Sequence, residues 1–465
     1  MKSERKSRTK PVSPYLLVIL SFVGVILLGS FLLTLPFAHQ DGNWGNYMDA
    51  LFHATSATCV TGLSTYANGI GNELTLFGQI VMLIMIQIGG LGFITILTFF
   101  VSLIQKKLLF KDRYMLAQAV NSSSIADVGK FVRRVIIIVA TAEIIGFGLG
   151  LPVFLNVPTY SVGDAIWASV FTSISAFNNA GFDIFGASSL IQGAGTIIDT
   201  LPTWAYYYMQ GYIMILIVMG GLSFLTIIDL TFQRKKLRQM SSFTRITLVM
   251  TGTLLVLGFG LLMLTDGING NITPYQALFQ SVTTRTAGFA TFDQSTLSPA
   301  GKTVSCFLMF IGGSPISTAG GIKTTTLFVL LLCVVRFLQG RKISAFKREF
   351  TNSSIVKTMT LVFMAVMVLV TGYICIASFE RGNPVATTEN TLFETFSAFG
   401  TVGLSSGDLT TTLTPTITIG SKIVICILMF FGRLGPITLF QIFQTNIDNE
   451  INTHYREIPT DVIIG

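Results

Sequence analysis

A short apolar stretch that ends in glycine occurs four times in this chain and constrains its fold more than any other feature. Each stretch begins with a phenylalanine and reaches its glycine ten residues later, or nine residues later in the third copy. Successive copies are separated by 119, 107 and 115 residues, counted between the glycines Gly62, Gly181, Gly288 and Gly403. Recurrence of one pattern at such regular spacing identifies an internal repeat. We therefore interpret the chain as four related units.

Each copy joins a short apolar helix to a glycine-terminated strand, which is what a cation filter needs. An ion that enters a pore exchanges its hydration shell for other oxygens, and rings of backbone carbonyls can supply them. Glycine tolerates the unusual backbone angles that turn successive carbonyls the same way, and the negative C-terminal end of the helix favours a cation. Thr401-Val402-Gly403 also matches the start of the potassium-channel filter sequence. We predict that K⁺ binds at Val60, Thr61, Gly62, Asn179, Ala180, Gly181, Thr286, Ala287, Gly288, Thr401, Val402 and Gly403.

The starts of these short helices carry capping residues. Asn46, Thr273 and Thr387 each stand six residues before their phenylalanine, and Ser161 with Asp164 can cap a longer helix in the second copy. From cap to filter each helix has about a dozen residues, roughly 18 Å, which is too short to cross a bilayer. We expect four re-entrant hairpins, which are stable only where protein or a water-filled pore surrounds them. The alternative is ordinary glycine-containing loops, and fourfold recurrence argues against it.

Composition and charge place the chain in a membrane. Only 11% of the residues are charged, against about 25% in soluble domains. Of the 30 lysines and arginines, most cluster in residues 2–10, 106–134, 234–245 and 336–357, which would all lie on one side. This positive-inside bias predicts a multi-pass plasma membrane protein with both termini in the cytoplasm. The polybasic loops and the lack of a signal peptide suit a bacterial membrane.

Eight apolar spans alternate with the four hairpins. We expect an all-α integral membrane fold in which four parallel repeats, each with outer helix, pore helix and inner helix, surround a pseudo-fourfold central pore. Within it, the second inner helix is expected to run unbroken from Trp204 to Phe232. The predicted boundaries are an N-terminal tail at 1–13, repeats at 14–107, 108–240, 241–350 (which holds the gate loop) and 351–443, and a C-terminal tail at 444–465.

No catalytic or metal-binding pattern accompanies the repeats. The five cysteines are scattered and mostly lie in apolar segments, and the three histidines have no ligand spacing. No nucleophile or carboxylate pair converges, so the sequence argues against an enzyme. We expect no bound cofactor, and K⁺ only as the transported ion.

The inner helices carry a second repeated signature, a glycine pair that can serve simple helix packing. The third copy departs from it, because the run after Gly312-Gly313 is so rich in Gly, Ser, Thr and Pro that it should break the helix. Broken helices at membrane depth persist where they line a cavity. We predict a gate at Gly312, Gly313, Ser314, Pro315, Ser317, Thr318, Ala319, Gly320, Gly321 and Lys323.

Charged residues inside the spans are the remaining candidates for function. Arg433 replaces the second glycine of the fourth pair, and an arginine at this depth would oppose cation occupancy below the filter. Its alternative role is structural, paired with a carboxylate or with pore-helix carbonyls. We assign Glu143 and Asp229 to structural pairing or a helix end, and Arg285 to hydrogen bonding beside the filter.

Together these features resemble the Trk/Ktr/HKT superfamily of cation transporters, and specifically the bacterial Ktr-type transmembrane subunit. The resemblance spans nearly the whole chain, from the four repeats to the glycine-rich break at Gly312 to Lys323 and to Arg433, where the family has its intramembrane gate and barrier arginine. It implies K⁺ uptake, because relatives that prefer Na⁺ tend to carry serine at the position of Gly62. It also implies a homodimer above a cytoplasmic ring of nucleotide-binding RCK-type subunits, and flux that Na⁺ can stimulate. No nucleic acid partner is implied.

Two rival functions stay open on the sequence. A secondary carrier would use inverted repeats and a midplane binding site, whereas these four repeats share one orientation. A sodium-dependent or sodium-conducting member of the same family is disfavoured by Gly62.

Overall fold

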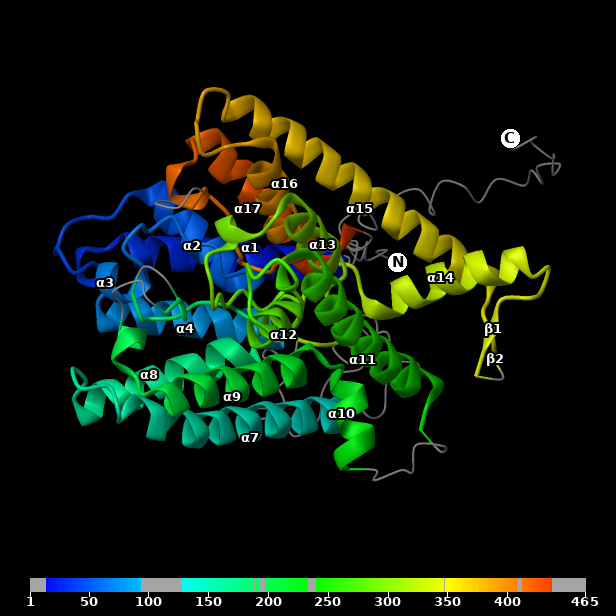
Figure 1. Cartoon of the computed structure of the whole chain (residues 1–465), viewed down its shortest axis with the longest axis horizontal. Coiled ribbons are helices and arrows are strands. Elements are labelled where there is room, and N and C mark those ends of the chain that lie inside the picture. The colour runs from blue at the N-terminus through cyan, green and yellow to red at the C-terminus, as the bar shows by residue number, and fades with distance from the viewer. Residues whose placement is uncertain are drawn as a thin grey trace, which may run out of the picture.

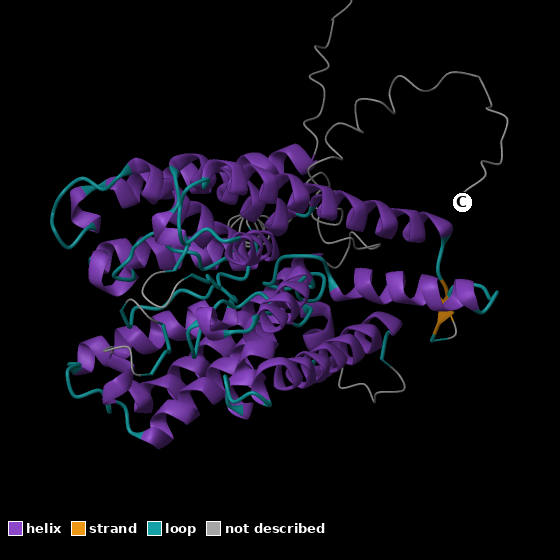
Figure 2. Cartoon of the chain, turned by 45° about the horizontal axis from the view of Figure 1, so that its top comes forward, coloured by secondary structure: helices purple, strands orange, loops and turns teal. Residues whose placement is uncertain are grey.

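The computed structural model describes residues 14–92, 128–186, 189–192, 197–232, 240–346, 348–407 and 412–436. Within these ranges the protein is helical, apart from one antiparallel strand pair, β1 (Ser344–Ala345) and β2 (Arg348–Glu349), at one end of the molecule (Figure 2). The predicted fold class is confirmed. The tails at 1–13 and 444–465, and the far ends of the first and fourth inner helices, lie outside the described residues, and the repeat boundaries stay predictions.

The first two repeats share one order of elements (Figure 1). Outer, pore and inner helices of the first are α1 (Pro14–Thr34), α2 (Tyr47–Cys59) and α4 (Leu76–Leu91), with α3 (Ile70–Glu73) before the last. In the second they are α7 (Val128–Phe154), α8 (Val162–Phe177) and α9 (Thr203–Gly221), followed by α10 (Phe224–Thr231). Short 3-10 turns cover Pro36–Ala38 and Ile197–Thr200.

The other two repeats follow the same plan. The third has α11 (Ser242–Leu262) with a π-helical turn (Met263–Gly267), α12 (Pro274–Thr283), α13 (Pro299–Phe310) and α14 (Thr324–Leu338). The fourth has α15 (Asn352–Phe379), α16 (Thr388–Gly400) and α17 (Ile419–Leu434). Short 3-10 turns cover Gln294–Thr296 and Thr414–Thr416.

Within the described residues, the second and third inner helices are interrupted. The third is interrupted between α13 and α14, as the glycine-rich run predicts. The second was expected to be continuous from Trp204 to Phe232, and this expectation is wrong, because α9 and α10 meet at an angle of 102°. Leu222 is extended at the break (φ −78°, ψ 146°), and the amide of Phe224 donates to the carbonyl of Ile316 in the third repeat, 2.9 Å away. A neighbouring repeat therefore replaces an intrahelical partner.

The repeats form a closed ring. The inner helix of each repeat packs against the pore helix of the next, in the pairs α4 with α8, α9 with α12, and α13 with α16, and the ring closes where α17 packs against α2. Four copies of one contact place the pore helices around a common axis. The buried phenylalanines that open the four repeated stretches, Phe52, Phe171, Phe279 and Phe393, are fully enclosed by this packing.

The outer surface of the ring is apolar. Three helices, Gly129–Phe154, Ser242–Gly267 and Asn352–Phe379, are long and apolar enough to cross a membrane, and the bent pair α9–α10 makes a fourth if it counts as one span. Large apolar side chains on the three helices stand exposed, such as Ile144, Val256 and Phe363, which are 69%, 71% and 62% exposed. A soluble protein rarely exposes so much apolar surface, whereas lipid would cover it.

Candidate functional site

The four short helices begin at the predicted caps. The side chains of Asn46 and Thr387 accept from the amides of Met48 and Asn390. Thr273 with Gln276, and Ser161 with Asp164, form complete capping boxes. These caps satisfy amides at the outer ends of the helices, so the opposite ends, with their unpaired carbonyls, point to the glycine strands.

The four glycine strands share one unusual backbone. The residue two positions before each glycine has a left-handed φ of 51–73°. Three of these residues, Val60, Thr286 and Thr401, are β-branched, for which this conformation is rare, and the fourth is Asn179. The glycines have φ values of 101°, 69°, 83° and 94° in chain order. Strain of this kind is stored at functional sites. The four glycine strands therefore share one backbone geometry.

Hydrogen bonds to the pore helices orient the peptide planes. The amides of Thr61, Ala180, Ala287 and Val402 each donate to a pore-helix carbonyl at 2.8–2.9 Å. A trans peptide points its N–H and its preceding C=O in opposite directions. The carbonyls one residue earlier in each strand therefore point away from the pore helices and toward the axis.

Side-chain hydroxyls of the pore helices form a second set of hydrogen bonds to the glycine strands. In the first and fourth copies, Ser56 and Ser397 accept from the glycine amides at 3.2 and 3.1 Å. In the other two, Ser175 and Thr283 donate to the carbonyls that follow the glycines, at 2.5 and 2.7 Å. These hydroxyls are not among the predicted site residues, although a serine stands six residues before the glycine in three of the four copies.

The strands meet at one point. A Cβ on any of the four glycines would lie closer than 3.0 Å to a carbonyl oxygen of the next copy, and these oxygens belong to Ala180, Ala287, Val402 and Thr61 in turn. The chain of contacts closes on itself from the first copy to the fourth. All twelve predicted filter residues are thus brought together, and the close approach explains why each strand carries glycine.

A cavity of about 170 Å³ lies on the outer side of this ring. The four glycines line its floor, and Asp183 and Asp293 are among its other lining residues. Asp183 accepts from the amide of Phe185 at 3.1 Å. Burial raises the pKa of this loop carboxyl to about 6. Carboxylates beside the entrance would attract cations from the outer solution.

The predicted gate residues form a non-helical loop on the inner side. We call residues 311–323, between α13 and α14, the gate loop. The amides of Ser314, Thr318 and Gly321 donate to the carbonyls of Gly221, Gly220 and Gly432 at 3.0–3.2 Å. A Cβ on Gly320 would collide with the side chain of Thr401. The loop therefore lies against the filter and is held by the glycine pairs of the neighbouring repeats.

Two cations hold the gate loop from within the protein. The ammonium of Lys323 donates to the carbonyls of Ala319 and Gly320 at 2.7 and 3.2 Å. Arg433 donates to the carbonyl of Thr318 and to those of Gly89 and, at 3.3 Å, Gly90. The partners of Arg433 are thus loop and inner-helix carbonyls, rather than the carboxylate or pore-helix carbonyls of the alternative structural role. One guanidinium joins the first, third and fourth repeats.

The other intramembrane charges have local partners. Glu143 accepts from Asn178 at 3.2 Å and also bonds Gln87, which ties α7 and α4 to the end of the second pore helix. Asp229 accepts from Thr244 and Ser241 at 2.6 and 3.2 Å and joins α10 to the start of α11. Arg285 donates to the carbonyl of Gly312 at 2.8 Å.

Known proteins resemble this chain along almost its entire length. The family model described as TrkH, cation transport protein, matches residues 3–455. The chain is 34% identical to the potassium/sodium uptake protein NtpJ of Enterococcus hirae over 99% of both chains. It is also 34% identical to the Ktr system potassium uptake protein B of Bacillus subtilis, over 95% of this chain and 97% of that one.

A solved structure shows the same fold. The crystal structure of the potassium transporter TrkH from Vibrio parahaemolyticus superposes with a TM-score of 0.70 at 18% identity, over 94% of this chain and 86% of that chain. The resemblance to the Trk/Ktr/HKT superfamily is thereby confirmed. The chain belongs to the TrkH family of cation transport proteins and is a multi-pass membrane transporter rather than an enzyme.

Proposed function

We propose that this protein takes up K⁺ through a selectivity filter made of the four glycine strands. The observation that supports the proposal best is the fourfold match of the strand backbones, in which the residue two positions before each glycine has the same left-handed conformation. Carbonyls turned toward one axis can replace the hydration shell of a dehydrated K⁺. The pore helices add the negative ends of their dipoles at the same point.

The relatives agree on the ion. Two relatives that are 34% identical to this chain are named as a potassium uptake protein and a potassium/sodium uptake protein. A second candidate function is therefore uptake of Na⁺ together with K⁺, or Na⁺ stimulation of K⁺ flux. The glycine at position 62, Gly62, favours K⁺ as the main substrate. A secondary carrier has no support in repeats of one orientation.

The gate loop supplies control in this proposal. Residues 311–323 lie across the inner side of the filter and would have to move for an ion to pass, while Arg433 adds a positive barrier beside them. The control signal would come from a cytoplasmic ring of RCK-type subunits, and the functional unit would be a homodimer in a bacterial plasma membrane with both termini inside. Ktr system proteins are named as parts of a system, in line with a separate partner.

Growth of a potassium-uptake-deficient bacterium on limiting K⁺ tests the proposal. We expect the wild-type chain to restore growth, with an RCK-type subunit co-expressed, and Gly403→Ser to abolish it. Rescue by Gly403→Ser equal to wild type, with unchanged preference for K⁺ over Na⁺, would exclude the filter. Growth restored by Na⁺-dependent uptake alone would favour the second candidate function.

A further inference from the structure

The third repeat breaks a contact that the other three share. In the first, second and fourth repeats, the first glycine of the inner-helix pair packs on the carbonyl four residues before the filter glycine. A Cβ on Gly89, Gly220 or Gly432 would lie closer than 3.0 Å to that oxygen, which belongs to Thr58, Phe177 and Phe399. These three inner helices thus press directly on the inner ends of their own pore helices.

In the third repeat the corresponding glycine has a different neighbour. A Cβ on Gly312 would instead collide with the carbonyl of Gly320, inside the gate loop. The amide of Ile322 bonds the carbonyl of Phe310 at 3.3 Å, and Thr324 bonds Gly313 at 3.1 Å, so the loop folds back on its own start. The direct contact between inner helix and pore helix has been exchanged for a contact within the loop.

Arg285 bridges the resulting gap. It stands three residues before Gly288, at the position taken by Cys59, Asn178 and Gly400 in the other copies. Its side chain is 6% exposed, and its Nη2 donates to the carbonyl of Gly312, the first residue of the predicted gate. A buried guanidinium is costly unless it is hydrogen-bonded, so this bond fixes the loop start relative to the filter strand.

The rest of the guanidinium faces a small cavity that is lined mostly by apolar side chains. Arg285 and Thr251 line a space of about 10 Å³ together with Gly221 and Gly313. Neither Nη1 of Arg285 nor the hydroxyl of Thr251 has a hydrogen-bond partner among the described residues. The space is near the minimum for one water molecule, and two free polar groups are the partners such a water needs. A water here would connect Arg285 to α11 beside the loop.

We propose that Arg285 is a positioning residue that couples the third filter strand to the gate loop. The proposal rests on the filter and the gate loop proposed above. K⁺ bound in the filter restricts the motion of the strand that carries Arg285. The bond from Arg285 to Gly312 then restricts the motion of residues 311–323. Coupling of this kind needs one element with two arrangements that both sites bias, and the gate loop is that element.

Hydrogen exchange of the gate loop in the purified full-length protein tests the coupling. We expect the amides of residues 311–323 to exchange more slowly in K⁺ than in choline buffer. Arg285→Gln should lose this difference, because the donor to Gly312 is shortened and neutral. Arg285→Lys keeps the charge but has a shorter reach, so it should retain part of the difference, and it provides a second variant if Arg285→Gln does not fold.

A buried cation of the same repeat serves as the matched control. Lys302 on α13 donates to Asn390 at 3.0 Å, and among the described residues its side chain has no hydrogen bond or ion pair with the gate loop. Lys302→Gln should keep the K⁺-dependent protection of the loop. If Arg285→Gln also keeps it, or if Lys302→Gln loses it to the same extent, the coupling role of Arg285 is excluded.

Thermal unfolding separates the two proposals. K⁺ bound in the filter raises the unfolding temperature of the wild type relative to choline whether or not the loop is coupled. No K⁺ stabilisation would count against the filter. Stabilisation by K⁺ with loop exchange that does not respond would overturn the coupling alone.

Discussion

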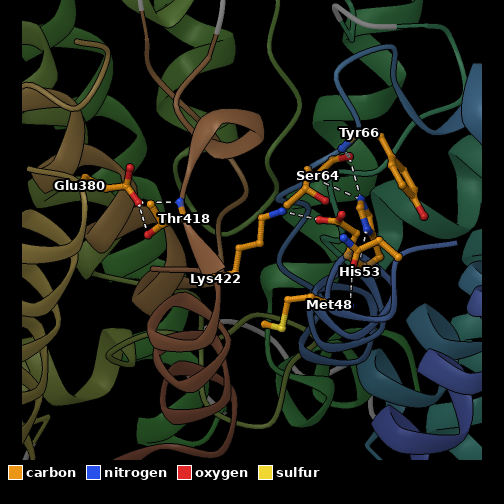
Figure 3. A network of polar contacts seen from close by, with 10 residues as sticks. Met48, His53, Ser64, Tyr66, Glu380, Thr418 and Lys422 are labelled. Carbon is orange, nitrogen blue, oxygen red and sulfur yellow. Dashed lines mark hydrogen bonds and ion pairs between the residues drawn. The ribbon is translucent and has the colours of Figure 1, made fainter. Parts of the chain in front are cut away.

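The ammonium of Lys422 lies 2.6 Å from the carboxylate of Asp49 and joins the first turn of α17 to the first turn of α2 (Figure 3). This ion pair links the last repeat to the first on the outer side of the protein. Both side chains are mostly shielded, at 13% and 22% exposed. One turn further along α2, His53 stacks on Tyr66 and bonds Ser64 at 2.9 Å, which holds the strand after the first filter glycine.

Removal of this ion pair should loosen the ring where it closes. We expect Lys422→Met and Asp49→Asn each to destabilise the protein by about 1–3 kcal/mol, because either change leaves a shielded charge unpaired. Thermal unfolding of both single variants and of the double variant measures the coupling. The double variant should cost clearly less than the sum of the two, and strict additivity would show that the pair contributes nothing.

A methyl group at Gly220 should be far more harmful than one at Gly221. A Cβ on Gly220 would collide with the carbonyl of Phe177. A Cβ on Gly221 would have no neighbour nearer than the side-chain amide nitrogen of Asn179, at 3.5 Å. We expect Gly220→Ala to cost at least about 2 kcal/mol of stability and to reduce K⁺ uptake. Gly221→Ala is the adjacent control, and an equal loss in both variants would contradict the packing described here.

Shortening the gate loop should open the inner side of the pore. Deletion of Ser314 to Ala319 removes the bonds to Gly220 and Gly221 and the Thr318 carbonyl that Arg433 binds. We expect higher flux that no longer depends on the cytoplasmic partner, measured as radiotracer K⁺ uptake with and without an RCK-type subunit. Flux that stays low and partner-dependent would remove the gate assignment.

A milder variant checks the same contact without changing the length of the loop. Thr318→Val removes the side-chain bonds to the carbonyls of Gly220 and Phe177, at 2.9 and 3.3 Å, and leaves the backbone bond to Gly220 in place. A partial rise in flux is expected, smaller than that of the deletion. A decrease would show that the hydroxyl serves conduction rather than closure.

Uptake should fall as the outer pH drops through about 6. Burial raises the pKa of Asp183 to about 6, so this carboxylate is charged above that pH and neutral below it. Among the described residues, the other ionisable groups near it are Asp293 and Tyr66, which line the same cavity, and Tyr160. Burial raises the pKa of both tyrosines, so they stay neutral throughout. Loss of the negative charge should lower uptake at subsaturating K⁺ by about two- to tenfold.

Asp183→Asn should take up K⁺ at every pH at the reduced rate that the wild type shows at low pH. Its uptake rate at pH 7.5 is expected to match that of the wild type at low pH, and its pH profile between about 5 and 7.5 to be flat. Asp293→Asn, on the same cavity, should keep the pH dependence of the wild type. A pH profile of Asp183→Asn that still bends near 6 would assign the titration to another group.

Several helix starts and one helix break could be predicted from the sequence, because they depend on local chemistry. The capping residues Asn46, Ser161, Thr273 and Thr387 start helices at the expected positions, because a cap depends on groups within three residues of it. The break after Phe310 was predictable for the same reason, since a dense run of Gly, Ser, Thr and Pro has low helix propensity. The bend after Gly221 was not, because a glycine pair also lies inside α4 without breaking it, and the bend depends on the bond from Phe224 to Ile316 of another repeat.

Contacts between distant segments account for what the sequence left open. The amide of Phe224 bonds the carbonyl of Ile316, about ninety residues later, and Asn178 meets Gln87 and Glu143 from two other helices. Arg433 shows what sequence alone can and cannot predict. Its position within a membrane span predicts a functional role, but its carbonyl partners come from two other repeats. No local pattern encodes which acceptor a buried side chain will find.

The sequence by itself determined the four repeated glycine stretches, the helical membrane fold and the interrupted third inner helix, because periodicity, hydropathy and backbone freedom are properties of a residue and its near neighbours. Only the tertiary structure decided how the repeats act on one another. It placed the filter strands against each other and set Gly312 apart from its counterparts Gly89, Gly220 and Gly432. Those relationships depend on which surfaces meet after the ring has closed, and so they exist only in the folded chain.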